Sequence, residues 1–286
     1  MAVYRRTYTS YAGALTPTWS RSLVLFRYSR RKLFKSRLQT ALFVLCFFWP
    51  LACLLFVYAA NNLSFLEKIG GVGGSIFKVD SDFFLTFIVV QGFLAFILTA
   101  FTGPGLISPD LSNGALPLYF CRPFSRAEYV VGKASVLAIV LSQITWIPGL
   151  VLFTVQASLA GPGWAWSHLW IAGSLLLSCL IWIAVLSLLA MALSAWVKWR
   201  VVAGALLLGV MFLGAGFGEA VNAVLRTQSG YFLNIVYLMG TVWRSLFRIN
   251  AEGSISPSEA WIALLVYCAI CLALLVRKVK AFEVVK

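Results

Sequence analysis

Long apolar segments separated by short polar stretches dominate the chain. Each of six segments approaches or exceeds the 20 or so residues that an α-helix needs to cross about 30 Å of hydrocarbon. They lie at 40–60, 83–102, 129–157, 168–197, 200–218 and 258–276. The pattern predicts an all-α polytopic membrane protein with six transmembrane helices. It also predicts a single domain over 1–286, divided into a cytoplasmic leader (1–39), a six-helix membrane part (40–276) and a basic tail (277–286).

Residues that start or bend helices lie at the expected places. Ser125 and Glu128 have the spacing of a capping box before the third span, and Ser167 precedes the fourth. The sixth span has helix-start residues as well, with Pro257 at the first helical position between Ser256 and Glu259. Pro50 and Pro148 fall inside the first and third spans, where a proline removes a backbone hydrogen bond. We therefore expect both of these helices to bend.

The segment before the last span is apolar but too short to cross a bilayer. Only 231–243 is continuously apolar, and Gly240 interrupts it. Over 219–250 we expect an external re-entrant or interfacial helical hairpin, with Trp243 and Arg248 near the lipid headgroups.

The leader contains a second kind of helix. Over 19–38, apolar residues recur near helical spacing and basic residues cover the remaining positions. This pattern predicts an amphipathic helix lying on the cytoplasmic leaflet. It would serve as a lipid anchor alone, or it would also pack against a cytoplasmic partner.

The charge balance of the chain is strongly basic, with 23 Lys and Arg against 9 Asp and Glu. In a chain this apolar, the excess indicates anionic lipids as partners and not nucleic acid. Most basic residues fall before the first span, at 103–133, at 196–200 and in the tail. By the positive-inside rule, this predicts a multi-pass protein of the plasma or inner membrane with both termini in the cytoplasm.

The residues needed for metal binding and catalysis are scarce. Cys268 and Cys271 have the spacing of half a zinc site, but His168 is the only histidine and no second pair exists, so we expect no metal. No G-x-x-x-x-G-K-[ST] segment is present to bind phosphates. We expect a chain that is not an enzyme and holds no cofactor of its own.

One polar segment between the second and third spans carries a motif. Over 108–133 the chain reads SPDLSNGALPLYFCRPFSRAEYVVGK. This resembles the cytoplasmic loop of the permease subunits of type-2 ABC exporters. The matching positions are Asp110, Gly114, Leu116, Arg122, Pro123, Ser125, Arg126, Glu128, Gly132 and Lys133.

The resemblance implies that this loop forms a short coupling helix which docks on a separate ATP-binding subunit. Ser108 would cap that helix, with Pro109 at its first position. The implied partner-binding residues are Asp110, Leu111, Gly114, Leu116, Arg122, Pro123 and Arg126. The resemblance also implies two ATP-binding subunits that hold ATP and Mg, and a second permease copy, most simply as a homodimer. Lys133 has a separate interpretation, as a basic residue that reaches the membrane interface.

Few polar residues lie within the spans. Gln91, Gln143 and Thr145 are candidates to line a translocation path, or to make hydrogen bonds between helices instead. Glu219 has Arg226 as its nearest basic neighbour in sequence, which favours an external salt bridge.

Two other classes of function fit the same pattern. One is a membrane anchor or assembly platform that recruits a cytoplasmic or extracytoplasmic complex without an ATPase. The other is a channel or secondary carrier, for which paired discontinuous helices or intramembrane charges would be expected. The spans show neither feature in the sequence.

Overall fold

The computed structural model describes residues 27–29, 33–62, 78–115, 126–249 and 255–278, and all of its regular elements are helices. Six helical segments among these residues are long and apolar enough to cross a membrane. They are Arg37–Asn61, Ser81–Ser112, Arg126–Ala160, Pro162–Trp196, Arg200–Leu225 and Pro257–Lys278. The prediction of a six-span all-α membrane protein is confirmed. Most of the predicted amphipathic helix over 19–38 lies outside the described residues.

The first three spans are each built from two helices in line. α2 (Arg37–Leu45) continues as α3 (Phe48–Asn61), α5 (Ser81–Thr102) as α6 (Pro104–Ser112), and α8 (Arg126–Ile144) as α9 (Trp146–Ala160). Pro50, Pro104 and Pro148 lie within a few residues of the three breaks. The bends predicted at Pro50 and Pro148 are therefore confirmed, and Pro104 marks a third.

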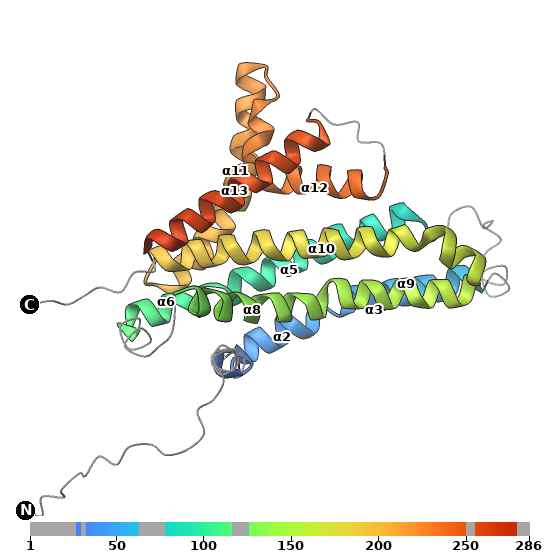
Figure 1. Ribbon diagram of the computed structural model, residues 1–286, viewed down its shortest axis with the longest axis horizontal. Helices are drawn as coiled ribbons and strands as arrows, with labels where there is room; N and C mark the ends of the chain where they lie inside the picture. The colour runs from blue at the N-terminus through green and yellow to red at the C-terminus, as the bar shows by residue number, and fades with distance from the viewer. Residues whose placement is uncertain (1–26, 30–32, 63–77, 116–125, 250–254, 279–286) are drawn as a thin grey trace, which may run out of the picture.

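The fourth span is the unbroken helix α10 (Pro162–Trp196), which forms the centre of the bundle (Figure 1). It packs against α5, α6, α8, α9, α11, α12 and α13. Within its most apolar 18-residue window 67% of residues are buried, against 22% in the first and last spans and 28% in the fifth. The first, fifth and sixth spans therefore lie at the periphery.

α10 begins five residues before the expected start at Ser167. Pro162 occupies the start of the helix, where its missing N–H costs nothing, and Ser167 donates to backbone carbonyls within the first turns. Of the capping box expected at Ser125 and Glu128, Ser125 lies outside the described residues. The sixth span, α13 (Pro257–Lys278), begins at Pro257 as expected, and Ser256 and Glu259 form a capping box there. The Ser256 N–H donates to Glu259 Oε2 at 3.0 Å, and the Glu259 N–H donates to Ser256 Oγ at 3.4 Å.

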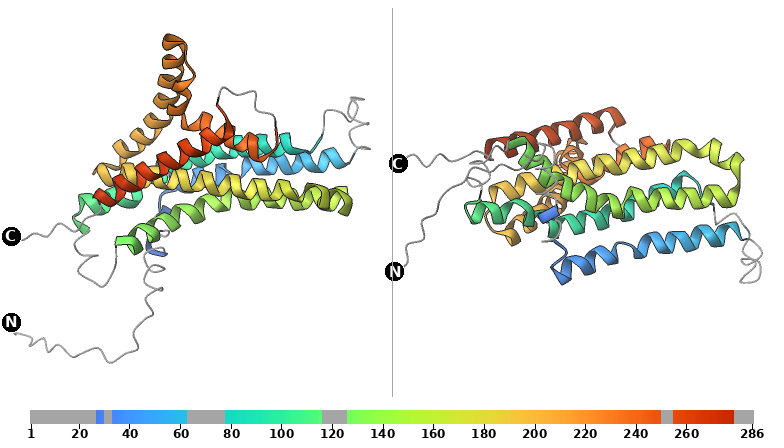
Figure 2. Two further views of the ribbon diagram at one scale, coloured as in Figure 1. Left: turned by 45° about the horizontal axis from the view of Figure 1, so that its top comes forward. Right: turned by 60° about the horizontal axis from the view of Figure 1, so that its bottom comes forward.

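The segment between the fifth and sixth spans is helical, as expected for 219–250. α11 (Arg200–Leu225) runs past the predicted end of its span and is followed by the 3-10 helix η1 (Ser229–Leu233) and α12 (Ile235–Leu246). The end of α11 and η1 pack together and extend away from the other spans (Figures 1 and 2). The contact places Gly218 against the Gly230 carbonyl, so the Gly214-x-x-x-Gly218 pattern serves packing within one chain.

The expected place of Trp243 near the headgroups is wrong. Trp243 is buried, and its Nε1–H donates to the Ser178 carbonyl at 3.3 Å, halfway along α10. Its ring lies edge-on to Trp182, which donates to the Gly92 carbonyl of α5 at 2.9 Å. α12 therefore enters the bundle as a short helix, because its apolar face packs on α10 and α13.

Gly92 is required by this arrangement, since a Cβ there would lie 2.7 Å from the Trp243 ring and 3.3 Å from Trp182 Nε1. Gly92→Ala should lower the midpoint of thermal unfolding in detergent, with an overpacking cost of about 1–3 kcal/mol. Gly173→Ala is the matched control, because a Cβ at this exposed α10 position meets nothing within 4 Å. That variant should keep or slightly raise the midpoint, and equal losses in the two variants would contradict the packing described here.

Candidate functional site

The candidate docking site begins where the second span breaks and turns into α6. Gly103 alone separates α5 from α6, which begins at Pro104, and a Cβ at Gly103 would lie 2.6 Å from the Ala190 Cβ of α10. One turn later, Ser108 and Ser194 are both fully buried. The Ser108 N–H donates to Ser194 Oγ at 2.9 Å, and Ser108 Oγ donates to the Ser194 carbonyl at 3.1 Å. The start of the motif is thus fixed to the centre of the bundle.

This contact corrects the role expected for Ser108. The helix that contains it begins at Pro104, and Pro109 lies inside this helix. Ser108 is therefore not the cap, and its hydroxyl is directed to α10 and not to a helix end. α6 is tied to the transmembrane bundle through its first turns, and only its last residues reach the predicted loop.

A buried ion pair joins the two ends of the motif. Asp110 Oδ2 lies 2.9 Å from Lys133 Nζ, and the two side chains are 14% and 6% exposed. The fully buried Tyr129 donates its hydroxyl to the same carboxylate oxygen at 2.8 Å, and Lys133 Nζ lies 5.7 Å from the centre of the Tyr129 ring. We call these three residues the Asp110 cluster. Lys133 therefore points into the protein and does not reach towards the membrane interface.

The other predicted docking residues separate into two groups. Leu111 is half-buried against the core, Gly114 has a positive φ of 62° just after α6, and Arg126 is exposed at the first turn of α8. Leu116, Arg122 and Pro123 lie outside the described residues. The structure thus places Asp110 inside the protein at the base of the loop, while Arg126 faces outward.

The Asp110 cluster connects the two helices that flank the loop. α6 leads into the loop and α8 leads out of it, so an ion pair between them fixes the separation of the two loop ends. The ammonium and the phenol together offset the hydration that the largely buried Asp110 carboxylate has lost. A force applied to the loop would therefore reach α6 and α8 together.

Gln91 is the most constrained of the candidate path residues. It is 1% exposed, and its side-chain amide donates to the carbonyls of Ile144 at 2.5 Å and Cys46 at 3.1 Å. These carbonyls lie four residues before Pro148 and Pro50, so they are the ones that lose a helical donor at each proline. The side-chain amide of Gln91 thus provides a hydrogen-bond donor for the free carbonyl at each bend, and it joins the first, second and third spans.

The other two candidate path residues, Gln143 and Thr145, differ in their exposure. Gln143 is exposed on α8, whereas Thr145 is buried and donates to the Leu141 carbonyl at 2.8 Å. Within one chain, then, Gln91, Gln143 and Thr145 do not line a common cavity. Their assignment to a path stays a prediction, with Gln143 the one residue of the three that faces out of the protomer.

Glu219 and Arg226 form no ion pair in the structure, contrary to expectation. They lie seven residues apart, at and near the end of α11, which places them about 10 Å apart along a helix axis. Arg226 instead ends the helix with a positive φ of 50°. Glu219 is exposed.

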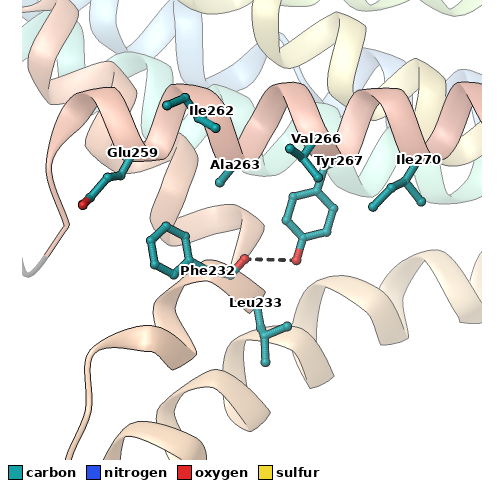
Figure 3. Close-up of a pocket in the computed structure, with 8 residues that line it drawn as sticks. All are labelled: Phe232, Leu233, Glu259, Ile262, Ala263, Val266, Tyr267 and Ile270. Atoms are coloured by element: carbon teal, nitrogen blue, oxygen red, sulfur yellow. Dashed lines mark hydrogen bonds between the residues drawn. The ribbon is translucent and has the colours of Figure 1, made fainter.

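An apolar groove with a volume of about 520 Å³ follows the sixth span (Figure 3). Phe232 and Leu233 of η1 face Ile262, Val266 and Ile270 of α13 across it, and the Tyr267 hydroxyl donates to the Phe232 carbonyl at 3.0 Å. Glu259 lies at one end of the row, where its carboxylate already serves the capping box. Apart from Glu259, the side chains that line this groove are mostly apolar, as on a surface that faces lipid.

Comparison of the sequence with protein-family models found no match, and comparison with curated proteins found none either. The class that the fold defines is therefore a six-span, all-α membrane protein. Among the described residues, no group of three or more His, Cys, Asp or Glu side chains is placed to hold a metal ion.

Sequence reasoning missed two members of the docking region. Tyr129 lies in the motif between Glu128 and Gly132 but matches no motif position, and Ser194 appears only as a polar residue in a span. A usable signal for Ser194 was the small pair Ala190 and Ser194, one helical turn apart, which allows close approach of a neighbouring helix. The tyrosine carried no comparable signal, because its partner Asp110 comes from another helix.

The Asp110 cluster can be tested by a double-mutant cycle. Asp110→Asn and Lys133→Met should each destabilise the chain by about 3–5 kcal/mol, because each removes one charge of a pair that is largely shielded from water. The double variant should lose much less than the sum of the two. Thermal unfolding of the purified chain measures all three losses, and additive losses would show that the two groups are not coupled.

The hydrogen bonds of Gln91 can be tested in the same way. Gln91→Leu should destabilise the chain by about 1–3 kcal/mol, since two buried carbonyls lose their donor. Gln143→Leu is the matched control, because this glutamine of α8 is exposed and a leucine in its place suits a bilayer. Thermal unfolding in detergent should separate the two, and equal midpoints would contradict the structural role of Gln91.

Proposed function

We propose that this chain is the permease subunit of an ATP-binding cassette exporter. Two copies would form the translocation path, and two separate ATP-binding subunits would hold ATP and Mg and dock on the loop between α6 and α8. The observation that carries the proposal is the 108–133 motif itself, whose two ends the Asp110 cluster joins at the start of two spans. Such a base suits a loop that receives force from a partner.

The distribution of roles within the motif follows from burial. Asp110 is a positioning residue, because it contacts Lys133 and Tyr129 inside the chain. The direct contacts with the ATP-binding subunit fall to Leu116, Arg122, Pro123 and the exposed Arg126, with Leu111 and Gly114 shaping the end of α6. An arginine in this place suits carboxylates of a partner.

The low burial of the first and fifth spans supports a second copy. Both present apolar side chains outward along much of their length, including Leu55, Phe212, Leu213 and Phe217. A homodimer is the simplest closed assembly for a chain that supplies half of a transporter. Motion of the docked loop would then pass through α6 to α10, to which Ser108 binds.

A membrane anchor or assembly platform is the alternative function, and it needs no ATPase. The test is to purify the tagged full chain from membranes of its source cells in a mild detergent. The preparation should contain a P-loop ATPase at a ratio of two to two and should hydrolyse ATP. A preparation of the same yield without a P-loop subunit would favour the anchor.

Leu116→Asp should abolish this association. A charge placed at the centre of a small apolar interface removes about 2 kcal/mol or more of binding free energy. The control is Trp199→Asp, which puts the same carboxylate on an exposed aromatic residue between α10 and α11, at a helix start where aspartate is favourable. ATPase recovery should fall at least tenfold for Leu116→Asp and stay unchanged for Trp199→Asp; full recovery with Leu116→Asp would refute docking through this loop.

A further inference from the structure

A second groove, with a volume of about 510 Å³, lies beside the start of the first span. Lys35 and Arg37 line one part of it together with Phe34 and Thr40, and the apolar residues of the helix that follows line the rest: Ala41, Val44, Leu45 and Phe48. Lys35 lies just before α2, and Arg37 is its first residue. Three of the apolar residues lie on α2, and Phe48 is the first residue of α3. The groove therefore has a cationic end and an apolar length.

The two cations are exposed and carry no ion pair with any described residue. The salt bridge that the described part of the chain contains joins Lys133 to Asp110, in another region of the bundle. Thr40, the one uncharged polar residue of the lining, turns its hydroxyl back to the Ser36 and Phe34 carbonyls at 3.2 and 3.4 Å. The charge of Lys35 and Arg37 is thus available to a ligand.

The apolar part of the groove is a single helical stripe. Positions 41, 44, 45 and 48 repeat at three- and four-residue intervals, which places them on one face over about 10 Å. The opposite face belongs to the bundle, where Gln39 is buried and donates to the Phe101 carbonyl of α5 at 3.3 Å. The stripe therefore faces away from the protein, in line with the two cations.

We propose that this groove binds one anionic phospholipid, with its phosphate on Lys35 and Arg37 and an acyl chain along the stripe from Ala41 to Phe48. A free phosphate would leave the apolar stripe uncovered. A second copy of the chain is disfavoured at this groove, because a two-fold contact here would bring Lys35 and Arg37 of both chains together. A lipid of the leaflet in which α2 begins supplies the negative head and the apolar tail in the required order.

The site goes beyond the transport proposal and does not depend on it. It makes the general expectation of anionic lipid partners specific to two cations and one helix face. A bound lipid would cover the outer side of α2 while Gln39 holds the inner side to α5.

The experiment is native mass spectrometry of the delipidated full chain, titrated with dioleoyl phosphatidylglycerol or dioleoyl phosphatidylcholine. The first phosphatidylglycerol should bind about tenfold more tightly than phosphatidylcholine, as two cations near one phosphate predict. Lys35→Gln with Arg37→Gln should remove this preference. The matched control is Lys198→Gln with Arg277→Gln, which removes two exposed cations outside the groove and should keep the preference.

Ala41→Trp separates a lipid site from simple charge attraction, because it fills the exposed groove and leaves both cations in place. It should weaken the first phosphatidylglycerol at least fivefold. Three results would overturn the proposal: a wild-type chain without preference, equal losses in the two double variants, or tight binding that survives Ala41→Trp. A crosslink between position 44 of two chains in native membranes would likewise assign the groove to a second copy and overturn it.

Discussion

Every backbone carbonyl inside a bilayer needs a donor, and Pro50, Pro104 and Pro148 each remove a donor near the break in one of three spans. Water cannot replace them at that depth, so the chain uses side chains. Gln91 serves the carbonyls freed by Pro50 and Pro148, and Gln39 and Arg200 both donate to Phe101 in the last turn before the third break. In each of these hydrogen bonds the donor side chain and the acceptor carbonyl belong to different helices. The hydrogen bonds that satisfy the carbonyls near the bends therefore also join the spans to one another.

Small residues permit the close approach that these contacts require. Gly103 meets Ala190 of α10, and Gly204 of α11 approaches the Ala100 carbonyl, which is the one left free by Pro104. Gly92 leaves room for the ring of Trp243. Without a hydrophobic driving force between helices in lipid, such tight packing and the buried hydrogen bonds are the main source of association.

The same bundle positions the region on which the proposed function depends. Ser108 fixes α6 to α10, and one turn later the Asp110 cluster joins α6 to α8. The loop that resembles an exporter coupling helix therefore begins and ends on elements that are joined to each other. α10 packs against both α6 and α8, so the two helices that flank the loop share one neighbour at the centre of the bundle.

The sequence by itself determined the all-α class, the six spans, the bends at Pro50 and Pro148 and the start of the last span at Pro257, because these depend on composition and on residues a few positions apart. It also carried the loop motif. Only the tertiary structure decided that Asp110 lies inside, paired with Lys133, that Gln91 bridges two bends, and that Trp243 is buried against α10. Each of these roles depends on a partner between 23 and 65 positions away in sequence, and no local pattern records which helix faces meet.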